Sequence, residues 1–383
     1  MAWVKPRTTT DGEKRFVACY RDPEGRTRSA GTFTSQRAAE RAGNREEQRV
    51  LGGNWHDPSL GAIPFQLYVE RDWLPSKHIE ATTRAAYVSN LNKHFLPFFG
   101  KKQMHQITPS LVQDWVTKAA ADGLSARSIG KYHTMLHSIF KRAVRDQLIV
   151  TNPCEHTELP KVITRNGPTI TSDEFDRLLE AIQERHRVMV ETAIETGMRW
   201  GELVALRPRH IDFLRKTITV EETIVEVSRK HSPTGERYVM KPYPKDNQPR
   251  TFGVDDDWLA KVALHIHGRS LDRDQLLFTT TAGTPISRNT FRTRVWLPAV
   301  AASGIGFNIR MHDLRHAHAS WLLGEGSDLK SVMDRMGHAQ IQTTQKYLHA
   351  QPDADRKNLD TLARARRRQS KESSDCTTRP MKN

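Results

Sequence analysis

The chain is short of cysteine and has no long apolar run, and each shortage excludes a class of protein. Cys19, Cys154 and Cys376 are its only cysteines, and no Cys-x-x-Cys pair occurs. Neither a disulfide framework nor a zinc finger is therefore indicated, and a reducing compartment fits. No stretch approaches the ~18 consecutive apolar residues of a membrane helix, and residues 1–10 lack the apolar segment of a secretory signal. We expect a cytoplasmic location and no membrane partner.

Acidic residues are also in deficit. The 59 lysines and arginines exceed the 44 aspartates and glutamates, which gives a net charge of +15 and a pI of about 9.8. Such an excess favours a polyanionic partner, although many basic proteins bind no nucleic acid, so charge alone does not decide. With 383 residues, the chain is too long for one ordinary core and predicts two or three domains.

Residues 311–350 contain the amphipathic segments around which the rest of the chain is organised. Apolar side chains recurring at three and four residues predict one helix from residue 311 and another from residue 329. Gly324, Gly326 and Gly337 mark their ends, and residues 341–348 are expected to form a third helix. Short helices in succession can direct polar side chains from separate turns into one cleft.

Four polar side chains of this segment suit chemistry on a phosphodiester. His312 and Arg315 lie three residues apart and share a helix face. His338 directly follows Gly337, and Tyr347 comes nine residues later. A guanidinium can bind two non-bridging phosphate oxygens, and a phenolate can attack phosphorus.

A metal site is the alternative to be weighed for this helix. His312, His316 and His318 form an H-x-x-x-H-x-H pattern, and histidines four residues apart on a helix can bind zinc. No glutamate follows as in H-E-x-x-H, and no second ligand cluster appears. We predict no metal and no other cofactor, with His316 a structural hydrogen-bonding residue and His318 a helix-face residue.

The motifs resemble a known family. H-D-L-R-H, L-x-x-V-x-x-x-M-G-H and T-T-Q-K-Y, all within residues 312–347, are similar to the C-terminal signature of the tyrosine recombinases, the phage-integrase family. T-G-M-R-W-G-E-L at residues 196–203 resembles the family's first signature box. The resemblance covers the second half of the chain strongly and the first half by organisation only.

The resemblance implies a role for each matching residue. Arg199 and Arg315 take the places of the two catalytic arginines, with Glu202 orienting the structure rather than reacting. His312 is implied as proton acceptor or hydrogen-bond partner, His338 as donor to a phosphate oxygen, and Tyr347 as the nucleophile.

A lysine on a β-hairpin turn completes the family's site. Lys245, followed by Arg250-Thr251-Phe252-Gly253-Val254, matches that layout best and would be the general acid. Lys241 is the competitor, because prolines flank Lys245 on both sides.

The pattern and the resemblance together predict a mainly α fold with small β-sheets (α+β). The expected domains are an arm-type DNA-binding module of one small sheet and a helix (1–58), a helical, SAM-like core-binding domain (62–155), a mixed α/β catalytic domain (168–352), and a C-terminal helix with a basic tail (353–383). Expected strands cover 16–20, 26–33, 217–227, 238–241, 250–254 and 276–279; expected helices cover 36–50, 64–74, 80–98, 109–121, 125–146, 258–267 and 287–302. Thr34-Ser35 is expected to cap the helix over 36–50, Thr82 or Thr83 the helix over 80–98, and Thr108 the helix over 109–121.

Two groups of basic residues are candidates for DNA contact outside the active site. In the first module a short sheet could enter a major groove, or its arginines could simply be a solvated face. In the helical domain a basic helix could contact phosphates, or it could be a solvated helix face. The candidates are Arg15, Arg21, Arg26 and Arg28 in the module, and Lys131, His133, Lys141 and Arg142 in the helical domain.

The implied function is site-specific DNA recombination by an integrase of a phage or an integrative mobile element. Double-stranded DNA at attachment sites would be cut and rejoined through a 3′-phosphotyrosyl intermediate, without metal or ATP, by a nucleoid-associated homotetramer. A DNA-bending host factor and an excisionase are further partners that the resemblance allows. A type IB topoisomerase and a non-catalytic DNA-binding regulator on the same fold remain the alternatives.

Overall fold

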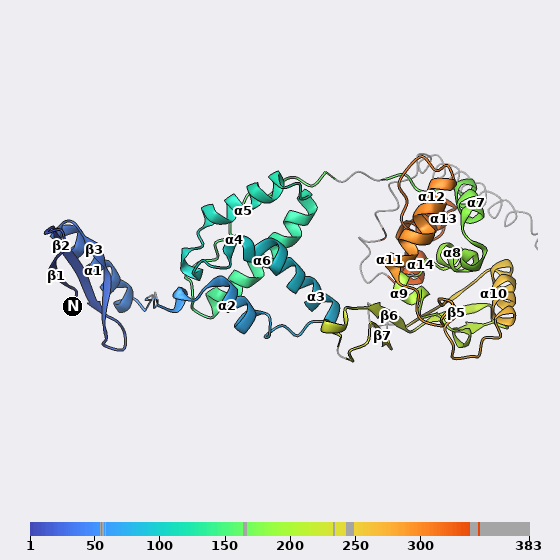
Figure 1. The fold of residues 1–383 in the computed structure, drawn as a ribbon, viewed down its shortest axis with the longest axis horizontal. Coiled ribbons are helices and arrows are strands. Elements are labelled where there is room, and N and C mark those ends of the chain that lie inside the picture. Colours follow the sequence, from blue (N-terminus) through green and yellow to red (C-terminus); the bar gives the residue numbers. More distant parts are fainter. Residues whose placement is uncertain are drawn as a thin grey trace, which may run out of the picture. The chain divides into compact units, whose positions relative to one another are not determined.

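The computed structural model describes residues 1–53, 55, 57, 59–163, 167–232, 234–242, 249–337 and 344. The chain divides into two compact units, Met1–Thr164 and Arg165–Asn383 (Figure 1). The fold is mainly helical with small antiparallel sheets, as predicted. Within these ranges no helix has both the length and the apolar character needed to cross a membrane.

The first unit begins with a three-stranded antiparallel sheet and one helix. Strands β1 (Trp3–Thr8), β2 (Lys14–Arg21) and β3 (Thr27–Phe33) lie in the order β1-β2-β3, and α1 (Gln36–Leu51) follows. Ser35 caps α1 as expected, by accepting a hydrogen bond from the Ala38 amide. Strand β1 was not predicted, because Pro6 and two basic residues interrupt its apolar alternation.

A helical bundle with its own apolar core makes up the rest of this unit. Its core is rich in large aromatic side chains, among them Phe65, Trp73, Phe95 and Phe140. Thr108 caps α5 as predicted, and Ser125 caps α6. Glu80 precedes α3, so the expectation that Thr82 or Thr83 caps that helix was wrong. The elements are η1 (Leu60–Ala62), α2 (Phe65–Tyr68), η2 (Val69–Trp73), α3 (Ala81–Asn90), η3 (Leu91–Phe95), α4 (Leu96–Phe99), η4 (Met104–Gln106), α5 (Pro109–Ala121) and α6 (Ala126–Arg145).

The second unit contains two small sheets. Strands β4 (Ile211–Asp212), β5 (Thr217–Val220) and β8 (Arg250–Gly253) form one, in the order β4-β5-β8, and β6 (Thr223–Glu226) pairs with β7 (Tyr238–Lys241) in the other. The single strand expected over 217–227 is thus two strands, because the chain leaves the first sheet at Glu221 and Glu222. A strand over 276–279 was also wrong: only an isolated bridge joins Thr279 to Pro285.

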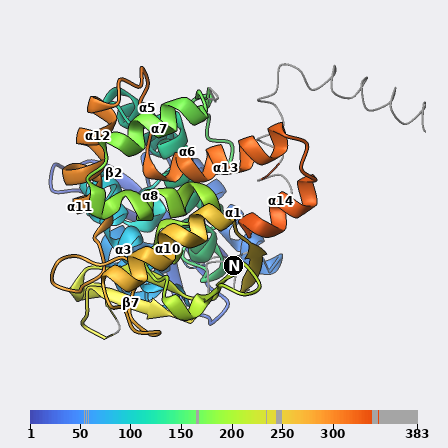
Figure 2. The same ribbon diagram turned by 90° about the vertical axis from the view of Figure 1, so that its right-hand side faces the viewer.

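Helices surround these sheets and share one apolar core. Helix α13 packs against both α8 and α14 (Figure 2), and a small apolar cluster that includes Leu323 and Met336 fills the space between α13 and α14. The helices are α7 (Ser172–Ala181), α8 (Glu184–Thr196), α9 (Trp200–Leu203), η5 (Pro208–His210), η6 (Arg229–His231), α10 (Asp256–Gly268), α11 (Arg288–Phe291), η7 (Arg292–Trp296), α12 (Leu297–Ala302), α13 (Met311–Gly324) and α14 (Leu329–Met336). The expected helices over 341–348 and after residue 353 lie outside the described residues.

Candidate active site

The site begins where α8 ends at Gly197. This residue has φ +59°, a left-handed conformation that favours glycine. A Cβ atom at Gly197 would lie 2.7 Å from the His318 ring and 2.9 Å from the Met336 sulfur. Both the backbone conformation and the close packing therefore require glycine in the T-G-M-R segment.

Arg199 follows at the start of α9, with its guanidinium held by two partners. Its Nη1 donates to a carboxylate oxygen of Glu202 at 3.1 Å, and its Nη2 donates to the Gly337 carbonyl at 2.9 Å. The Arg199 backbone amide also donates to Glu202, at 3.0 Å. Glu202 is buried, and its carboxylate orients Arg199 by binding both the guanidinium and the backbone amide.

Arg315 approaches the same point from α13. Its side chain is buried, and its guanidinium donates to the carbonyls of Gly197 and Met336. Arg315 and Arg199 thus bind the consecutive carbonyls of Met336 and Gly337, which places the two guanidinium groups beside each other at the C-terminal end of α14. The partial negative charge of that helix end favours both cations.

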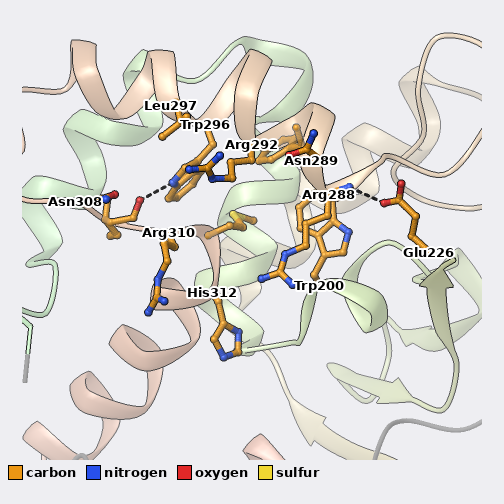
Figure 3. Close-up of a pocket in the computed structure, with 13 residues that line it drawn as sticks. Trp200, Glu226, Arg288, Asn289, Arg292, Trp296, Leu297, Asn308, Arg310 and His312 are labelled. Carbon is orange, nitrogen blue, oxygen red and sulfur yellow. Dashed lines mark hydrogen bonds between the residues drawn. The ribbon is translucent and has the colours of Figure 1, made fainter. Parts of the chain in front are cut away.

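His312 lies one turn before Arg315 on α13 and lines a hollow of about 470 Å³ (Figure 3). Its ring meets that of His316 edge to face, with centroids 5.0 Å apart. The His312 side chain is exposed to solvent in the hollow, but neighbouring protein atoms bury part of its ring. This partial burial is the largest cause that lowers the pKa of His312 to about 4, and the positive charges of His316, Arg315 and Arg288 lower it further. The imidazole is therefore neutral at pH 7 and can accept a proton or a hydrogen bond.

The hollow beside His312 combines an aromatic wall with cations. Trp200 (Figure 3) contributes aromatic surface together with Phe291, and their rings lie 5.3 Å apart. Arg288, Arg292 and Arg310 also line it and are exposed. Sequence reasoning missed these three arginines, because an exposed arginine on a helix, or directly before one, looks like an ordinary solvated residue. A hollow of this composition suits a phosphate backbone next to a sugar or base.

Comparison with known proteins decides the family. A model described as "Phage integrase family" matches residues 168–353, and one described as "Phage integrase, N-terminal SAM-like domain" matches residues 71–120. The chain belongs to the phage integrase family. The first match covers every described residue of the site above.

Relatives agree with this membership over most of the chain. The putative prophage phiRv2 integrase of Mycobacterium tuberculosis is 27% identical over 358 residues, 89% of this chain and 90% of the relative. The tyrosine recombinase XerC of Bacillus licheniformis is 28% identical over 298 residues, 73% of this chain and 90% of the relative. The chain is a tyrosine site-specific recombinase of a phage or mobile element.

Solved structures show the same fold. An integrase of the transposon Tn1549, in complex with a circular intermediate DNA, superimposes with a TM-score of 0.65 at 20% identity and covers 78% of this chain and 98% of its own. A lambda integrase tetramer bound to a Holliday junction gives a TM-score of 0.55 at 21% identity, with 88% and 95% covered.

Three residues that the integrase signature implies, Lys245, His338 and Tyr347, lie outside the described residues. Helix α14 ends at Gly337, as predicted, and Gly337 has a left-handed φ of +61°. The Gly337 carbonyl that binds Arg199 belongs to the peptide bond leading to His338. Thr344, three residues before Tyr347 in sequence, is buried. Lys241, the competitor for the general acid, is the last residue of β7.

His318 is not the helix-face residue that the sequence suggested. It is buried; its Nδ1 bonds the Ile194 carbonyl at 2.7 Å, and its Nε2 accepts a hydrogen bond from Arg335 at 3.0 Å. Burial and then the Arg335 charge lower the pKa of His318 to about 3. Apolar spacing could not reveal this role, because the partners come from α8 and α14. Among the described residues no group of three potential ligands is placed to hold a metal ion.

The basic residues of the N-terminal sheet divide between its two faces. Ala18 faces α1, and side chains alternate along a strand, so Arg15 and Arg21 lie on the opposite, open face. Arg28 pairs with Tyr20 on the helix side and binds Asp22 at 2.8 Å and Asp57 at 2.7 Å. Arg26 lies in the turn before β3. The sequence did not reveal that Lys5 and Arg7 of β1 share the open face with Arg15.

The candidates on α6 also differ in their surroundings. Lys131 and Lys141 are exposed. His133 is half-buried against the backbone of Cys154, and this burial lowers its pKa. Arg142 binds Asp146 at 2.6 Å and the Ser76 hydroxyl at 3.0 Å. Lys131 and Lys141 are thus the members of the group best placed to reach a ligand.

Proposed function

We propose that this recombinase cuts and rejoins double-stranded DNA at attachment sites with six catalytic residues. The observation that carries the proposal is the pair of guanidinium groups on consecutive carbonyls at the end of α14, one peptide bond before His338. Two adjacent guanidiniums suit a phosphate whose charge grows in the transition state. The catalytic set is Arg199, Lys245, His312, Arg315, His338 and Tyr347.

In the proposed reaction the Tyr347 phenol attacks the scissile phosphate. An O–P bond forms to the tyrosine, the bond from phosphorus to the 5′-oxygen breaks, and a 3′-phosphotyrosyl link and a free 5′-hydroxyl result. The phenol proton passes to neutral His312 or to a base that it orients, while Lys245 protonates the departing 5′-oxygen. Because a phenol has a pKa of about 10, Arg199 and Arg315 favour the reaction by stabilising negative charge at the phosphate.

The energetics of this exchange need neither ATP nor a metal ion. One phosphodiester is replaced by another phosphate ester, so a 5′-hydroxyl of a second duplex can reverse the step and join a new strand. The guanidiniums supply the charge stabilisation that a cation would otherwise provide. Four protomers exchanging strands in two sequential steps would complete recombination.

DNA contact outside the catalytic residues is proposed on three surfaces. The hollow lined by Arg288 and Arg292 is placed to hold the backbone beside the scissile phosphate. Lys131 and Lys141 on α6 are placed for phosphates of the core site. Residues 1–58 would act as an arm-binding module, with the open face of its sheet carrying the contact. The basic residues on that face are Lys5, Arg7, Arg15 and Arg21. A homotetramer, a DNA-bending host factor and an excisionase complete the proposed assembly.

The decisive experiment replaces the nucleophile. On a nicked suicide substrate, Tyr347→Phe should bind DNA as the wild type does but form no covalent protein–DNA adduct, because phenylalanine has no oxygen to attack phosphorus. Tyr238→Phe, on β7 of the same unit, is the matched control and should form the adduct normally. Equal adduct with Tyr347→Phe would reject the assignment.

Joining of two distinct sites separates a recombinase from a type IB topoisomerase, which only relaxes DNA.

The general acid is tested through the leaving group. A 5′-bridging sulfur leaves as a thiolate without a proton, so Lys245→Ala should cleave such a substrate at nearly the wild-type rate while losing about 100-fold on ordinary DNA. Failure of this rescue for Lys245→Ala, with rescue of Lys241→Ala, would transfer the role to Lys241.

A further inference from the structure

Arg335, the penultimate residue of α14, takes no part in the proposed reaction, yet each nitrogen of its guanidinium is bound to a different element. Its Nε donates to Nε2 of His318 on α13 at 3.0 Å, and its Nη1 donates to the Gly253 carbonyl at the end of β8 at 2.8 Å. Its Nη2 donates to the Glu195 carbonyl of α8 at 3.0 Å. The guanidinium also lies over the Phe252 ring, 4.5 Å from its centroid. A half-buried, planar cation with three separate acceptors is held in one position.

His318 extends this contact along α8. Its Nδ1 binds the Ile194 carbonyl at 2.7 Å, so Nδ1 carries the proton and Nε2 is left as the acceptor that Arg335 requires. Burial keeps His318 neutral, with a pKa of about 3, and a neutral imidazole has one donor and one acceptor. Together, Arg335 and His318 therefore connect α14 and α13 to the consecutive carbonyls of Ile194 and Glu195 on α8.

The two helix ends joined in this way supply both carbonyl acceptors of Arg315. The Gly197 carbonyl lies at the end of α8, two residues beyond Glu195, and the Met336 carbonyl belongs to the residue after Arg335. Apolar side chains hold α14 against α13, but such contacts are non-directional and do not set where a carbonyl points. Hydrogen bonds do set it, because their distances and angles are restricted. The separation of the two acceptors therefore depends on the bonds of Arg335.

We propose that Arg335 is a positioning residue for Arg315: together with His318, it holds the ends of α8 and α14 at the separation that the two carbonyl acceptors of Arg315 require. The inference rests on the proposed function, in which Arg315 stabilises negative charge at the scissile phosphate. Loss of the Arg335 bonds leaves Arg315 present and charged but allows α14 to shift relative to α8. A misplacement of about 1 Å can cost about a hundredfold in rate.

The test is a double-mutant cycle in the full-length chain, with the rate of covalent adduct formation on the nicked suicide substrate as the measurement. Arg335→Met keeps a long apolar side chain beside Phe252 but removes the charge and the donors, and we expect it to slow the reaction by about tenfold or more. Arg315→Lys keeps a cation that cannot bind two carbonyls in one plane. In that background Arg335→Met should cost only about threefold or less. This residual loss is expected because the next carbonyl along the chain binds Arg199.

Lys330→Met is the matched control for the cycle. It removes an exposed cation from the same helix, and Lys330 pairs only with Asp334 of that helix among the bonds and ion pairs of the described residues. It should leave the rate unchanged in both backgrounds.

The outcomes separate the inference from the proposed function. If Arg315→Lys alone is slow and the loss from Arg335→Met is not at least threefold smaller in that background, the inference is overturned and the proposed function stands. A wild-type rate for Arg335→Met alone would overturn the inference as well. A wild-type rate for Arg315→Lys alone would reject the catalytic role of Arg315, and the inference with it. Should Arg335→Met fail to fold, Arg335→Lys enters the same cycle, since it keeps the charge but cannot bind three acceptors in one plane.

Discussion

Backbone carbonyls help to hold the guanidinium groups of Arg199 and Arg315, the two arginines proposed as catalytic, in place. Arg315 is buried with carbonyl partners from α8 and α14, and Arg199 reaches the next carbonyl of α14. Since a guanidinium is planar and carries five N–H donors, bonds to two fixed acceptors define its plane. The site is therefore prearranged before any phosphate enters, which is the condition for strong electrostatic stabilisation of a transition state.

Gly197 provides a test of this arrangement with an internal control. Gly197→Ala should destabilise the second unit by about 2–4 kcal/mol, because it adds a clash with His318 and Met336 to the cost of a left-handed alanine. Gly304→Ala has the same strain, at φ +71°, but no atom within 4 Å of the added Cβ, and should cost only about 1 kcal/mol. Denaturant unfolding of the two variants measures the difference. Equal losses would show that packing at Gly197 contributes nothing.

At the scale of elements, the N-terminal sheet separates cations bound to its own acidic residues from cations on its open face. Asp22 is buried in the turn after β2, and burial by itself would raise its pKa. The hydrogen bonds from the Arg28 guanidinium and the Arg26 amide outweigh burial and lower the pKa of Asp22. Arg28 also lies over Trp55, 6.0 Å from the ring centroid. Arg28 therefore belongs to the internal structure of the module, whereas Arg7 on the open face has no such surroundings among the described residues.

This difference predicts opposite effects of two arginine substitutions. Arg28→Ala should lower the midpoint of thermal unfolding of the module by several degrees, since it removes the guanidinium that binds the buried Asp22 carboxylate. Arg7→Ala should leave the midpoint unchanged but weaken binding of arm-type DNA and reduce the salt dependence of that binding by about one counterion. Thermal unfolding and DNA titrations at several salt concentrations measure both. A stable Arg28→Ala protein with weakened DNA binding alone would contradict the assignment.

At the scale of the whole molecule, buried histidines make the second unit sensitive to acid. Burial is the main cause that lowers the pKa of His186 to about 4 and that of His318 to about 3, whereas an unfolded histidine has a pKa of about 6.5. Below pH 6.5 the unfolded chain therefore binds more protons than the folded one. Stability is complete above that pH and is lost as the pH falls towards 4.

We expect the free energy of unfolding of this unit to fall by about 1.4 kcal/mol per pH unit for each of the two histidines between pH 6 and 4.5. His186→Leu removes one titrating group from a site whose neighbours include the Phe291 ring, so its slope should be smaller by about one proton. Denaturant unfolding of the full-length chain across this range provides the measurement. An unchanged slope would mean that His186 is not buried in its neutral form.

Particular elements show how much of the fold could be predicted from the sequence. The caps Ser35 and Thr108 and the end of α14 at Gly337 were predicted correctly, because each depends on one or two residues acting on their own backbone. Strand β1 and the division of 217–227 into two strands were missed, because strand pairing depends on partners distant in sequence. Fold class and family were predicted for the same reason as the caps: the motifs are contiguous.

By itself, the sequence predicted which residues would carry the chemistry, since a guanidinium, an imidazole and a phenol at family spacing have few other uses. Only the tertiary structure decided how the described ones meet. Arg199 and Arg315 are 116 positions apart in number, yet both bind the end of α14, and Glu202 joins Arg250 to Arg199 from a strand 48 positions away. No local pattern encodes these contacts, because a buried charge selects its partners by burial and distance in the folded chain.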